Sequence, residues 1–291
     1  MEVNKIAVIG AGTMGRGIAY AAALGGYCTI LEDVSAPVLQ QGLAYVRETL
    51  EEGIARGKVT PLQKEQALAC LGSAGSVEEA CREADLVIEA APEEMELKVD
   101  IFCILDKFAK PGAIFASNTS SLSITEIAAV TCRPEKCVGM HFFNPVPKMK
   151  LLEIVRALET SEDTLATCRE VGRRMDKEVV VVRESPGFVT SRINALIGNE
   201  AFHMLQEGIA SAEDIDKAMR LGLNHPMGPF ELVDLVGLDV RLSILEYLHN
   251  TLGEKYRPSP LLRQYVKAGR LGRKAGRGVY EYPDAKAKGQ A

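Results

Sequence analysis

Short apolar runs alternate with longer amphipathic stretches over the first 185 residues of the chain. The runs are rich in Val, Ile and Leu, and they predict buried strands of a parallel sheet. They cover residues 5–9, 27–31, 85–89, 113–116, 136–140, 151–155 and 178–182. The stretches between them predict helices, so this part of the chain has the pattern of a doubly wound α/β fold. Residues 178–182 include four consecutive valines, and we expect this strand to lie inside the sheet.

Two regions depart from this alternation. Residues 35–72 have helical composition interrupted by Gly-Lys, and they predict a helical hairpin inserted between two strands. After Pro186 the strand pattern stops, and helices are expected at residues 188–208, 212–221, 229–252 and 259–268. The pattern therefore predicts a sheet domain at residues 1–185 and a smaller, all-helical domain at residues 186–291.

The first strand runs directly into a Gly-x-Gly-x-x-Gly sequence at residues 10–15. In this motif Gly10 permits a tight turn, Gly12 lets the backbone approach a pyrophosphate, and Gly15 lets the next helix pack closely on the strand. The N-terminal end of that helix then faces the phosphates. The motif predicts a dinucleotide-binding, Rossmann-like domain, and the alternative is a structural turn that binds nothing.

The second predicted strand leads into Glu32, which lies 22 residues after Gly10. A carboxylate at this spacing accepts hydrogen bonds from the ribose hydroxyls of the nucleotide and repels a 2′-phosphate. We therefore predict NAD rather than NADP as the cofactor.

Composition argues against several classes of protein. The 291 residues are 47% hydrophobic and 25% charged, with a net charge of -5 and interleaved signs, so no nucleic-acid partner is expected. The chain has no apolar run of about 18 residues and no basic leader, which predicts a cytoplasmic protein without a membrane partner. The seven cysteines lack C-x-x-C spacing and are typical of free thiols. No metal site is expected, because the Glu200-x-x-His203 pair has no second copy to complete a di-iron set.

The strongest candidate chemistry lies at His141, with Glu153 twelve residues later. A strand ending near His141, a turn at Asn144-Pro145 and a returning strand bring the two side chains together across a hairpin. A neutral imidazole accepts an alcohol proton near neutral pH, and a carboxylate beside it fixes the tautomer and favours the imidazolium that forms. The pair predicts a general base, and the alternative is a satisfied core histidine beside a solvent-facing glutamate.

Polar residues also follow the third and fourth predicted strands. Ser117 and Asn118 begin the sequence Ser-Asn-Thr-Ser-Ser at the edge where open α/β sheets bind ligands, and we expect them to orient a substrate oxygen. Glu93 and Lys98 follow the third strand. They are candidates for cofactor contacts, and the alternative is a solvated helix start.

Six short motifs, spread over the whole chain, carry a resemblance to a known family. They are Gly-Ala-Gly-Thr-Met-Gly at 10–15, Ser-Asn-Thr-Ser-Ser at 117–121, His-Phe-Phe-Asn-Pro at 141–145, Pro-Gly-Phe-Val at 186–189, Pro-Met-Gly-Pro-Phe-Glu-Leu at 226–232 and Gly-Arg-Lys-x-Gly-Arg-Gly at 272–278. Together they resemble the motifs of the short-chain L-3-hydroxyacyl-CoA dehydrogenases, and most closely those of the bacterial 3-hydroxybutyryl-CoA dehydrogenases.

The resemblance implies an NAD-dependent oxidoreductase of fatty acid and butanoate metabolism. Such an enzyme interconverts an L-3-hydroxyacyl-CoA, here 3-hydroxybutyryl-CoA, and the 3-ketoacyl-CoA, here acetoacetyl-CoA, by hydride transfer. It implies His141 as the catalytic base and Glu153 as its partner, with Ser117, Asn144 and Ser191 as substrate contacts. The implied cofactor contacts are Gly10, Gly12, Thr13, Met14, Gly15, Glu32, Ala90, Glu93, Lys98, Ser117 and Asn144.

One position departs from the family pattern. Members commonly carry asparagine before the arginine of Gly-Phe-Val-x-Asn-Arg, where this chain has Ser191. A serine hydroxyl reaches less far than an amide. Asn194 and Asn199 are candidates to compensate.

Other readings of the function and assembly stay open at this point. The same base and cofactor would also serve a hydroxy acid without CoA, such as a sugar acid or carnitine, and the fold also suits a crystallin-like structural dimer. The wide apolar surface expected on the helical domain predicts a homodimer through that domain, with packing on the sheet domain as the alternative.

Overall fold

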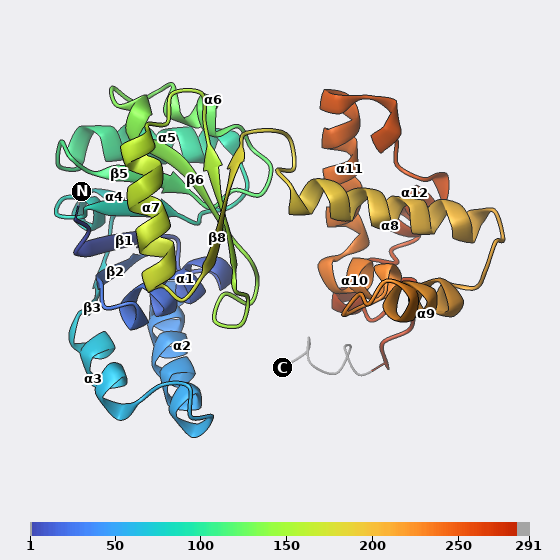
Figure 1. Ribbon diagram of the computed structural model, residues 1–291, viewed down its shortest axis with the longest axis horizontal. Coiled ribbons are helices and arrows are strands. Elements are labelled where there is room, and N and C mark those ends of the chain that lie inside the picture. Colours follow the sequence, from blue (N-terminus) through green and yellow to red (C-terminus); the bar gives the residue numbers. More distant parts are fainter. Residues whose placement is uncertain (1, 284–291) are drawn as a thin grey trace. The chain divides into compact units, whose positions relative to one another are not determined.

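The computed structural model describes residues 2–283, so residue 1 and the end of the expected helical domain, residues 284–291, lie outside the described residues. The described chain forms two compact units that divide between Ser185 and Pro186 (Figure 1).

The first unit is built on a sheet whose described strands follow the order β3-β2-β1-β4-β5-β6-β7-β8. The strands are β1 (Lys5–Ile9), β2 (Cys28–Glu32), β3 (Leu71–Ala74), β4 (Leu86–Glu89), β5 (Ile114–Ser117), β6 (Cys137–Phe142), β7 (Leu151–Arg156) and β8 (Glu178–Arg183). The strands from β1 to β6 are parallel, whereas β7 runs antiparallel to β6 and β8 runs parallel to β7. This arrangement confirms the prediction of a doubly wound α/β sheet.

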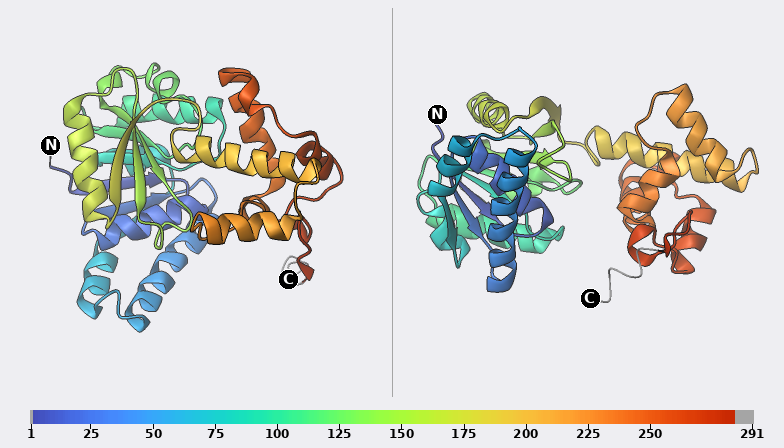
Figure 2. Two further views of the ribbon diagram at one scale, coloured as in Figure 1. Left: turned by 45° about the vertical axis from the view of Figure 1, so that its right-hand side comes forward. Right: turned by 90° about the horizontal axis from the view of Figure 1, so that it is seen from below.

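Helices cover both faces of this sheet (Figure 2). Helices α1 (Thr13–Leu24), α2 (Ala36–Ala55) and α7 (Glu162–Arg174) pack on one face, and α4 (Val77–Cys81), α5 (Met95–Phe108) and α6 (Ile124–Ala128) pack on the other. Successive residues of a strand point to opposite faces. In β1, Ile6 and Val8 therefore join the first cluster, and Ala7 and Ile9 join the second.

The expected helical hairpin is formed by α2 and α3 (Pro61–Ala69), which extend beyond the sheet (Figures 1 and 2). The start of α3 is fixed locally, because the Thr60 hydroxyl accepts a hydrogen bond from the backbone of Gln63 while the Gln63 side chain accepts one from Thr60. Pro61 occupies the first helical position, where a missing N–H costs nothing.

Two details of the sheet differ from expectation. The prediction that residues 178–182 lie inside the sheet is wrong, because β8 is an edge strand in which the Val180 side chain is 43% exposed. Val179 and Val181 pack on the hydrophobic cluster beneath α1, α2 and α7. The other two valines of the run are not needed for this core, and they agree with the general preference of valine for strands. Strand β3 was not expected, since Leu-Gly-Ser-Ala is short and carries no β-branched residue.

The second unit is helical in its described part and packs around Phe202, Phe230 and Leu245. Its helices are α8 (Thr190–Gln206), α9 (Ala212–Gly222), α10 (Pro229–Val236), α11 (Leu238–Leu252) and α12 (Pro260–Lys267). Short 3₁₀ turns are η1 (Pro134–Lys136) in the first unit and η2 (Glu254–Tyr256) and η3 (Arg273–Ala275) in the second. The expected single helix over residues 229–252 is broken at Gly237, whose φ of 108° is open to glycine but strained for other residues.

A buried aspartate shapes the Gly-rich basic turn at residues 272–278. The Asp234 carboxylate accepts hydrogen bonds from the backbone N–H groups of Val279, at 2.8 Å, and Tyr280, at 2.9 Å. A Cβ added at Gly278 would lie 2.0 Å from Asp234 Oδ1, so only glycine fits there. Close packing within the helical unit thus accounts for a motif that also suggests a phosphate-binding turn.

Candidate functional site

The carboxyl ends of the parallel strands bring the sequence-predicted residues of the first unit to one edge of the sheet. Ile9 is the register partner of both Glu32 and Glu89, and Glu89 is the partner of Ser117. Strand β6 continues beyond this row to His141. Strand β1 lies between β2 and β4, so the chain order reverses there, which is where open α/β sheets bind ligands.

The glycine turn after β1 has the geometry that a pyrophosphate requires. Gly10 has a φ of 94°, and a Cβ at Gly15 would lie 1.7 Å from the carbonyl oxygen of Gly10. Gly12 precedes α1 and has no atom within 4 Å of its Cβ direction, so a ligand can approach the backbone here. Thr13 and Met14 form the first turn of α1. The turn therefore fits the diphosphate of a dinucleotide at a helix N-terminus.

Two carboxylates stand at the end of β2. The Glu32 side chain is 1% exposed, and its Oε1 atom has no hydrogen-bond partner among residues 2–283. Burial, with the nearby charge of Asp33 as a second cause, raises the pKa of Glu32 to about 7. The carboxylate of Asp33 accepts hydrogen bonds from the backbone N–H of Ala11 at 2.9 Å and of Ser35 at 2.8 Å. Asp33, one position after the predicted Glu32, therefore contacts the glycine turn.

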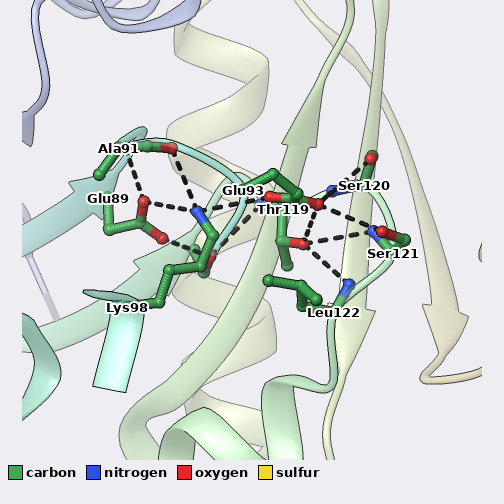
Figure 3. Close-up of polar contacts among 9 residues, drawn as sticks. Glu89, Ala91, Glu93, Lys98, Thr119, Ser120, Ser121 and Leu122 are labelled. Atoms are coloured by element: carbon green, nitrogen blue, oxygen red, sulfur yellow. Dashed lines mark hydrogen bonds and ion pairs between the residues drawn. The ribbon is translucent and has the colours of Figure 1, made fainter. Parts of the chain in front are cut away.

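A fully buried carboxylate, Glu89, joins the ends of β4 and β5 (Figure 3). It accepts hydrogen bonds from Lys98 Nζ at 2.7 Å, from the backbone N–H of Ala91 at 2.6 Å and from the Ser117 hydroxyl at 2.6 Å. Ala90, between Glu89 and Ala91, lies against the glycine turn. Glu89 was not among the site residues predicted from the sequence. A charged residue at the end of an apolar strand could have indicated it.

Glu93 connects this cluster to the loop after β5 (Figure 3). Its Oε1 atom accepts hydrogen bonds from the Thr119 hydroxyl at 2.6 Å, the Ser120 backbone N–H at 3.0 Å and the Ser121 hydroxyl at 3.3 Å. Its Oε2 atom lies 3.5 Å from Lys98 Nζ. Lys98 is therefore placed between two carboxylates.

The loop after β5 distributes its polar groups differently from the expectation. Ser117 is fully buried, and its hydroxyl donates a hydrogen bond to Glu89. Any effect of Ser117 on a ligand is therefore expected to pass through the Glu89 carboxylate. The Asn118 side-chain oxygen accepts a hydrogen bond from the backbone N–H of Phe142 at 2.9 Å, next to His141. The partly exposed Ser120, which sequence analysis did not single out, offers a hydroxyl closer to solvent.

His141 and Glu153 form a buried pair across the β6–β7 hairpin. They are register partners on antiparallel strands, and His141 Nδ1 lies 2.7 Å from Glu153 Oε2. Glu153 is fully buried and His141 is 7% exposed. Because a carboxylate only accepts hydrogen bonds, Nδ1 carries the proton and Nε2 of the neutral ring is the basic nitrogen. The arrangement suits proton exchange at Nε2.

Two further predicted residues belong to other segments of the chain. Asn144 is exposed in the turn between β6 and β7. Ser191 lies in the first turn of α8, in the second unit. Asn199 is buried, and both ends of its amide bond backbone groups of the loop before α12, so it is unsuited to replace the family asparagine. Asn194 is partly exposed and remains a candidate.

Two other kinds of feature, a membrane-spanning helix and a metal cluster, are absent from residues 2–283. Among residues 2–283 no helix combines the length and the apolar character needed to cross a bilayer. The same stretch of chain holds no group of three or more His, Cys, Asp or Glu side chains suited to a metal ion.

Two family models cover nearly the whole chain. The model for the NAD-binding domain of 3-hydroxyacyl-CoA dehydrogenase matches residues 5–185, and the model for the C-terminal domain of that enzyme matches residues 187–282. A probable 3-hydroxybutyryl-CoA dehydrogenase of Bacillus subtilis is 48% identical over 285 residues, covering 98% of this chain and 99% of the relative. A 3-hydroxybutyryl-CoA dehydrogenase of Bradyrhizobium diazoefficiens is 46% identical, with 98% and 97% covered. The crystal structure of (S)-3-hydroxybutyryl-CoA dehydrogenase from Ralstonia eutropha superposes with a TM-score of 0.93 at 45% identity, with 97% and 99% covered.

Proposed function

The chain belongs to the 3-hydroxyacyl-CoA dehydrogenase family, and from this we propose its reaction and the roles of its residues. The protein is an NAD-dependent oxidoreductase that interconverts an L-3-hydroxyacyl-CoA and the 3-ketoacyl-CoA. Its preferred substrate is the four-carbon 3-hydroxybutyryl-CoA, the substrate in the names of similar proteins.

The His141–Glu153 pair is the observation that carries this proposal. In the oxidation direction Nε2 of His141 takes the proton of the 3-hydroxyl group, and the imidazolium that results is stabilised by the buried carboxylate of Glu153, 2.7 Å from Nδ1. In the reduction direction the same nitrogen returns the proton to the 3-keto oxygen. A positioned base of this kind contributes about 10²- to 10⁴-fold to the rate.

The sheet edge supplies the residues for the cofactor. When bound, NAD would supply the hydride acceptor of the reaction at its nicotinamide ring. The glycine turn would hold the diphosphate, the carboxylates at the end of β2 would accept hydrogen bonds from the ribose hydroxyls, and Glu93 and Lys98 would contact the nicotinamide end. We assign the main ribose contact to Asp33, which bonds the glycine turn, and a weaker one to Glu32.

Substrate contacts come from residues near the histidine and from the second unit. Ser120, which is partly exposed, is assigned to the substrate oxygen. Asn144, which is exposed, is assigned to the adjacent amide of the cofactor. Ser191 is assigned to the acyl group, with Asn194 as the neighbouring donor.

Steady-state kinetics with 3-ketoacyl-CoA thioesters of four to ten carbons, each with NADH and with NADPH, tests the proposal. The expected result is the highest kcat/KM for acetoacetyl-CoA with NADH. Oxidation of free 3-hydroxybutyrate at the rate of its CoA thioester would instead favour a dehydrogenase of free hydroxy acids. Absence of NADH oxidation with every thioester would favour the structural, crystallin-like role.

We also propose that the protein is a cytoplasmic homodimer. Large apolar side chains are exposed on helices α8 to α11 of the helical unit and on residues that flank α8 and α9, and they suit a partner surface: Val189, Ile193, Ile209, Leu221, Leu223, Leu235, Val236 and Val240. Sedimentation equilibrium is expected to give twice the chain mass, and Leu221→Glu with Leu235→Glu is expected to give monomers. A monomeric wild-type protein would contradict this proposal.

A further inference from the structure

The buried ammonium group of Lys98 is surrounded by acceptors of the protein itself. Its side chain is 1% exposed, and three acceptors surround Nζ: Glu89 at 2.7 Å, the carbonyl oxygen of Ala91 at 3.3 Å and Glu93 at 3.5 Å (Figure 3). An ammonium group carries three donors. Lys98 is therefore held in one place, and it holds Glu93 in turn.

Glu89, at the end of β4, is central to this arrangement because its carboxylate bonds both α5 and the end of β5. It neutralises Lys98 on α5, and it receives the Ser117 hydroxyl at the last residue of β5 at 2.6 Å. Both Glu89 and Ser117 are fully buried, so water does not compete for these bonds.

From these two contacts a continuous set of bonds reaches the loop at residues 118–121. Through Lys98, the position of Glu93 is set, and Glu93 accepts from Thr119 and from the backbone of Ser120. Through Ser117, the start of the loop is set, and Asn118 then bonds the backbone of Phe142 next to the catalytic histidine.

We propose that Glu89 is a positioning residue for the dehydrogenase reaction, which fixes the loop at residues 118–121 through its bonds to Lys98 and Ser117. The inference rests on the proposed function, in which this loop orients the substrate between the nicotinamide and His141. Glu89 touches neither substrate nor cofactor in this scheme. It acts by keeping the loop hydroxyls in the geometry of the reaction, and a misplacement of about 1 Å in such groups lowers rates by about 100-fold.

A purely structural ion pair would behave differently. Loss of Glu89 would then reduce the amount of folded protein, while each folded molecule would keep its full turnover. A positioning role instead lowers kcat per folded molecule and leaves the KM for NADH nearly unchanged.

The test uses Glu89→Gln and the milder Ser117→Ala, which removes one bond to Glu89 and leaves the buried charges paired. Thr131→Val is the matched control, because it also deletes a buried hydroxyl, donated to the carbonyl of Ala128 at 2.9 Å, away from this cluster. NADH fluorescence titration counts the folded sites, and kcat for acetoacetyl-CoA is expressed per site. We expect a loss of about 100-fold for Glu89→Gln, about tenfold for Ser117→Ala and less than about twofold for the control. The combined Glu89→Gln and Ser117→Ala variant is expected to lose little beyond Glu89→Gln, since Ser117 acts on the loop through the Glu89 carboxylate.

Hydrogen–deuterium exchange of the cofactor-free proteins gives a second readout that does not depend on activity. Peptides covering residues 117–122 are expected to exchange faster in Glu89→Gln and Ser117→Ala than in the wild type or in Thr131→Val. If the wild type lacks dehydrogenase activity, the proposed function fails and the exchange data still decide the positioning role. Unchanged exchange at the loop, or full kcat per NADH site in both variants, would overturn the inference.

Discussion

Two buried acid–base pairs lie in the first unit, one at the end of β4 and the other across β6 and β7, and their surroundings differ. Lys98–Glu89 and His141–Glu153 each have a nitrogen–oxygen distance of 2.7 Å and a fully buried carboxylate. The ammonium of Lys98 donates hydrogen bonds to Glu89 and to the carbonyl oxygen of Ala91, and it also forms an ion pair with Glu93. An imidazole has two ring nitrogens and exchanges protons near neutral pH, which an ordinary ammonium does not. The comparison assigns a fixed, orienting role to the first pair and chemistry to the second.

Removal of the carboxylate charge is expected to lower the free energy of unfolding far more for the Lys98–Glu89 pair than for the His141–Glu153 pair. Glu89→Gln leaves a buried ammonium without its main counterion, and the free energy of unfolding is expected to fall by about 3–5 kcal/mol. Glu153→Gln leaves an imidazole that is stable when neutral, and the fall is expected to be about 1 kcal/mol, the scale of one hydrogen bond. Urea unfolding at pH 7.5 measures both. Equal losses would erase the distinction between the pairs.

Activity is expected to separate them in a second way. Glu153→Gln keeps the shape of the side chain but removes the charge that stabilises the imidazolium, and kcat is expected to fall by about 100-fold with the KM for NADH nearly constant. A shift confined to the KM for NADH would mean that Glu153 serves cofactor binding instead.

The two carboxylates at the end of β2 allow a test of which side chain contacts the ribose of the cofactor. Asp33→Asn is expected to weaken NADH binding by about tenfold, the effect of one or two charge-assisted hydrogen bonds, and Glu32→Gln by less. Fluorescence titration with NADH and NADPH measures both variants. The reverse order would return the ribose contact to Glu32.

Glu32 also makes a prediction for pH. Its pKa is raised from 4.5 to about 7 by burial, so the folded protein holds a proton that the unfolded chain releases between those values. The contribution of this group to stability therefore falls as pH rises through that window. Glu32→Gln is expected to remove the effect and to stabilise the cofactor-free protein at pH 8 by about 1–3 kcal/mol. A variant that is less stable than the wild type at pH 8 would show that the charge is compensated.

The smallest expected effect concerns the acyl group. Ser191→Asn restores the amide common in the family, and the KM for acetoacetyl-CoA is expected to fall by about two- to tenfold, the value of one hydrogen bond. An unchanged KM would indicate that Asn194 or another group already holds the acyl carbonyl.

Periodicity and spacing were enough to predict most of the fold and the contact between His141 and Glu153. The parallel strands follow from continuous apolar runs, and the hairpin that joins His141 to Glu153 follows from the turn residues between them. The edge position of β8 was not predictable, because valines favour strands whether one face or two are covered. The break at Gly237 was missed, since a single glycine inside an apolar helical pattern is often tolerated.

The site was less predictable where function depends on hydrogen-bond geometry. Ser117 and Ser120 are alike in sequence, and only the sheet register shows that the first is buried against Glu89. Glu32 and Asp33 are adjacent acidic residues, and only the structure shows that Asp33 accepts a hydrogen bond from Ala11 of the glycine turn while the Oε1 atom of Glu32 lacks a partner among residues 2–283.

The most direct test of the central claim is a single turnover of acetoacetyl-CoA by the NADH-loaded protein, compared between the wild type and His141→Gln. The account predicts that the variant oxidises NADH at least about 1,000-fold more slowly, while its NADH dissociation constant stays within about threefold of the wild type. A rate within about tenfold of the wild type would contradict the assignment of His141 as the proton-transferring base.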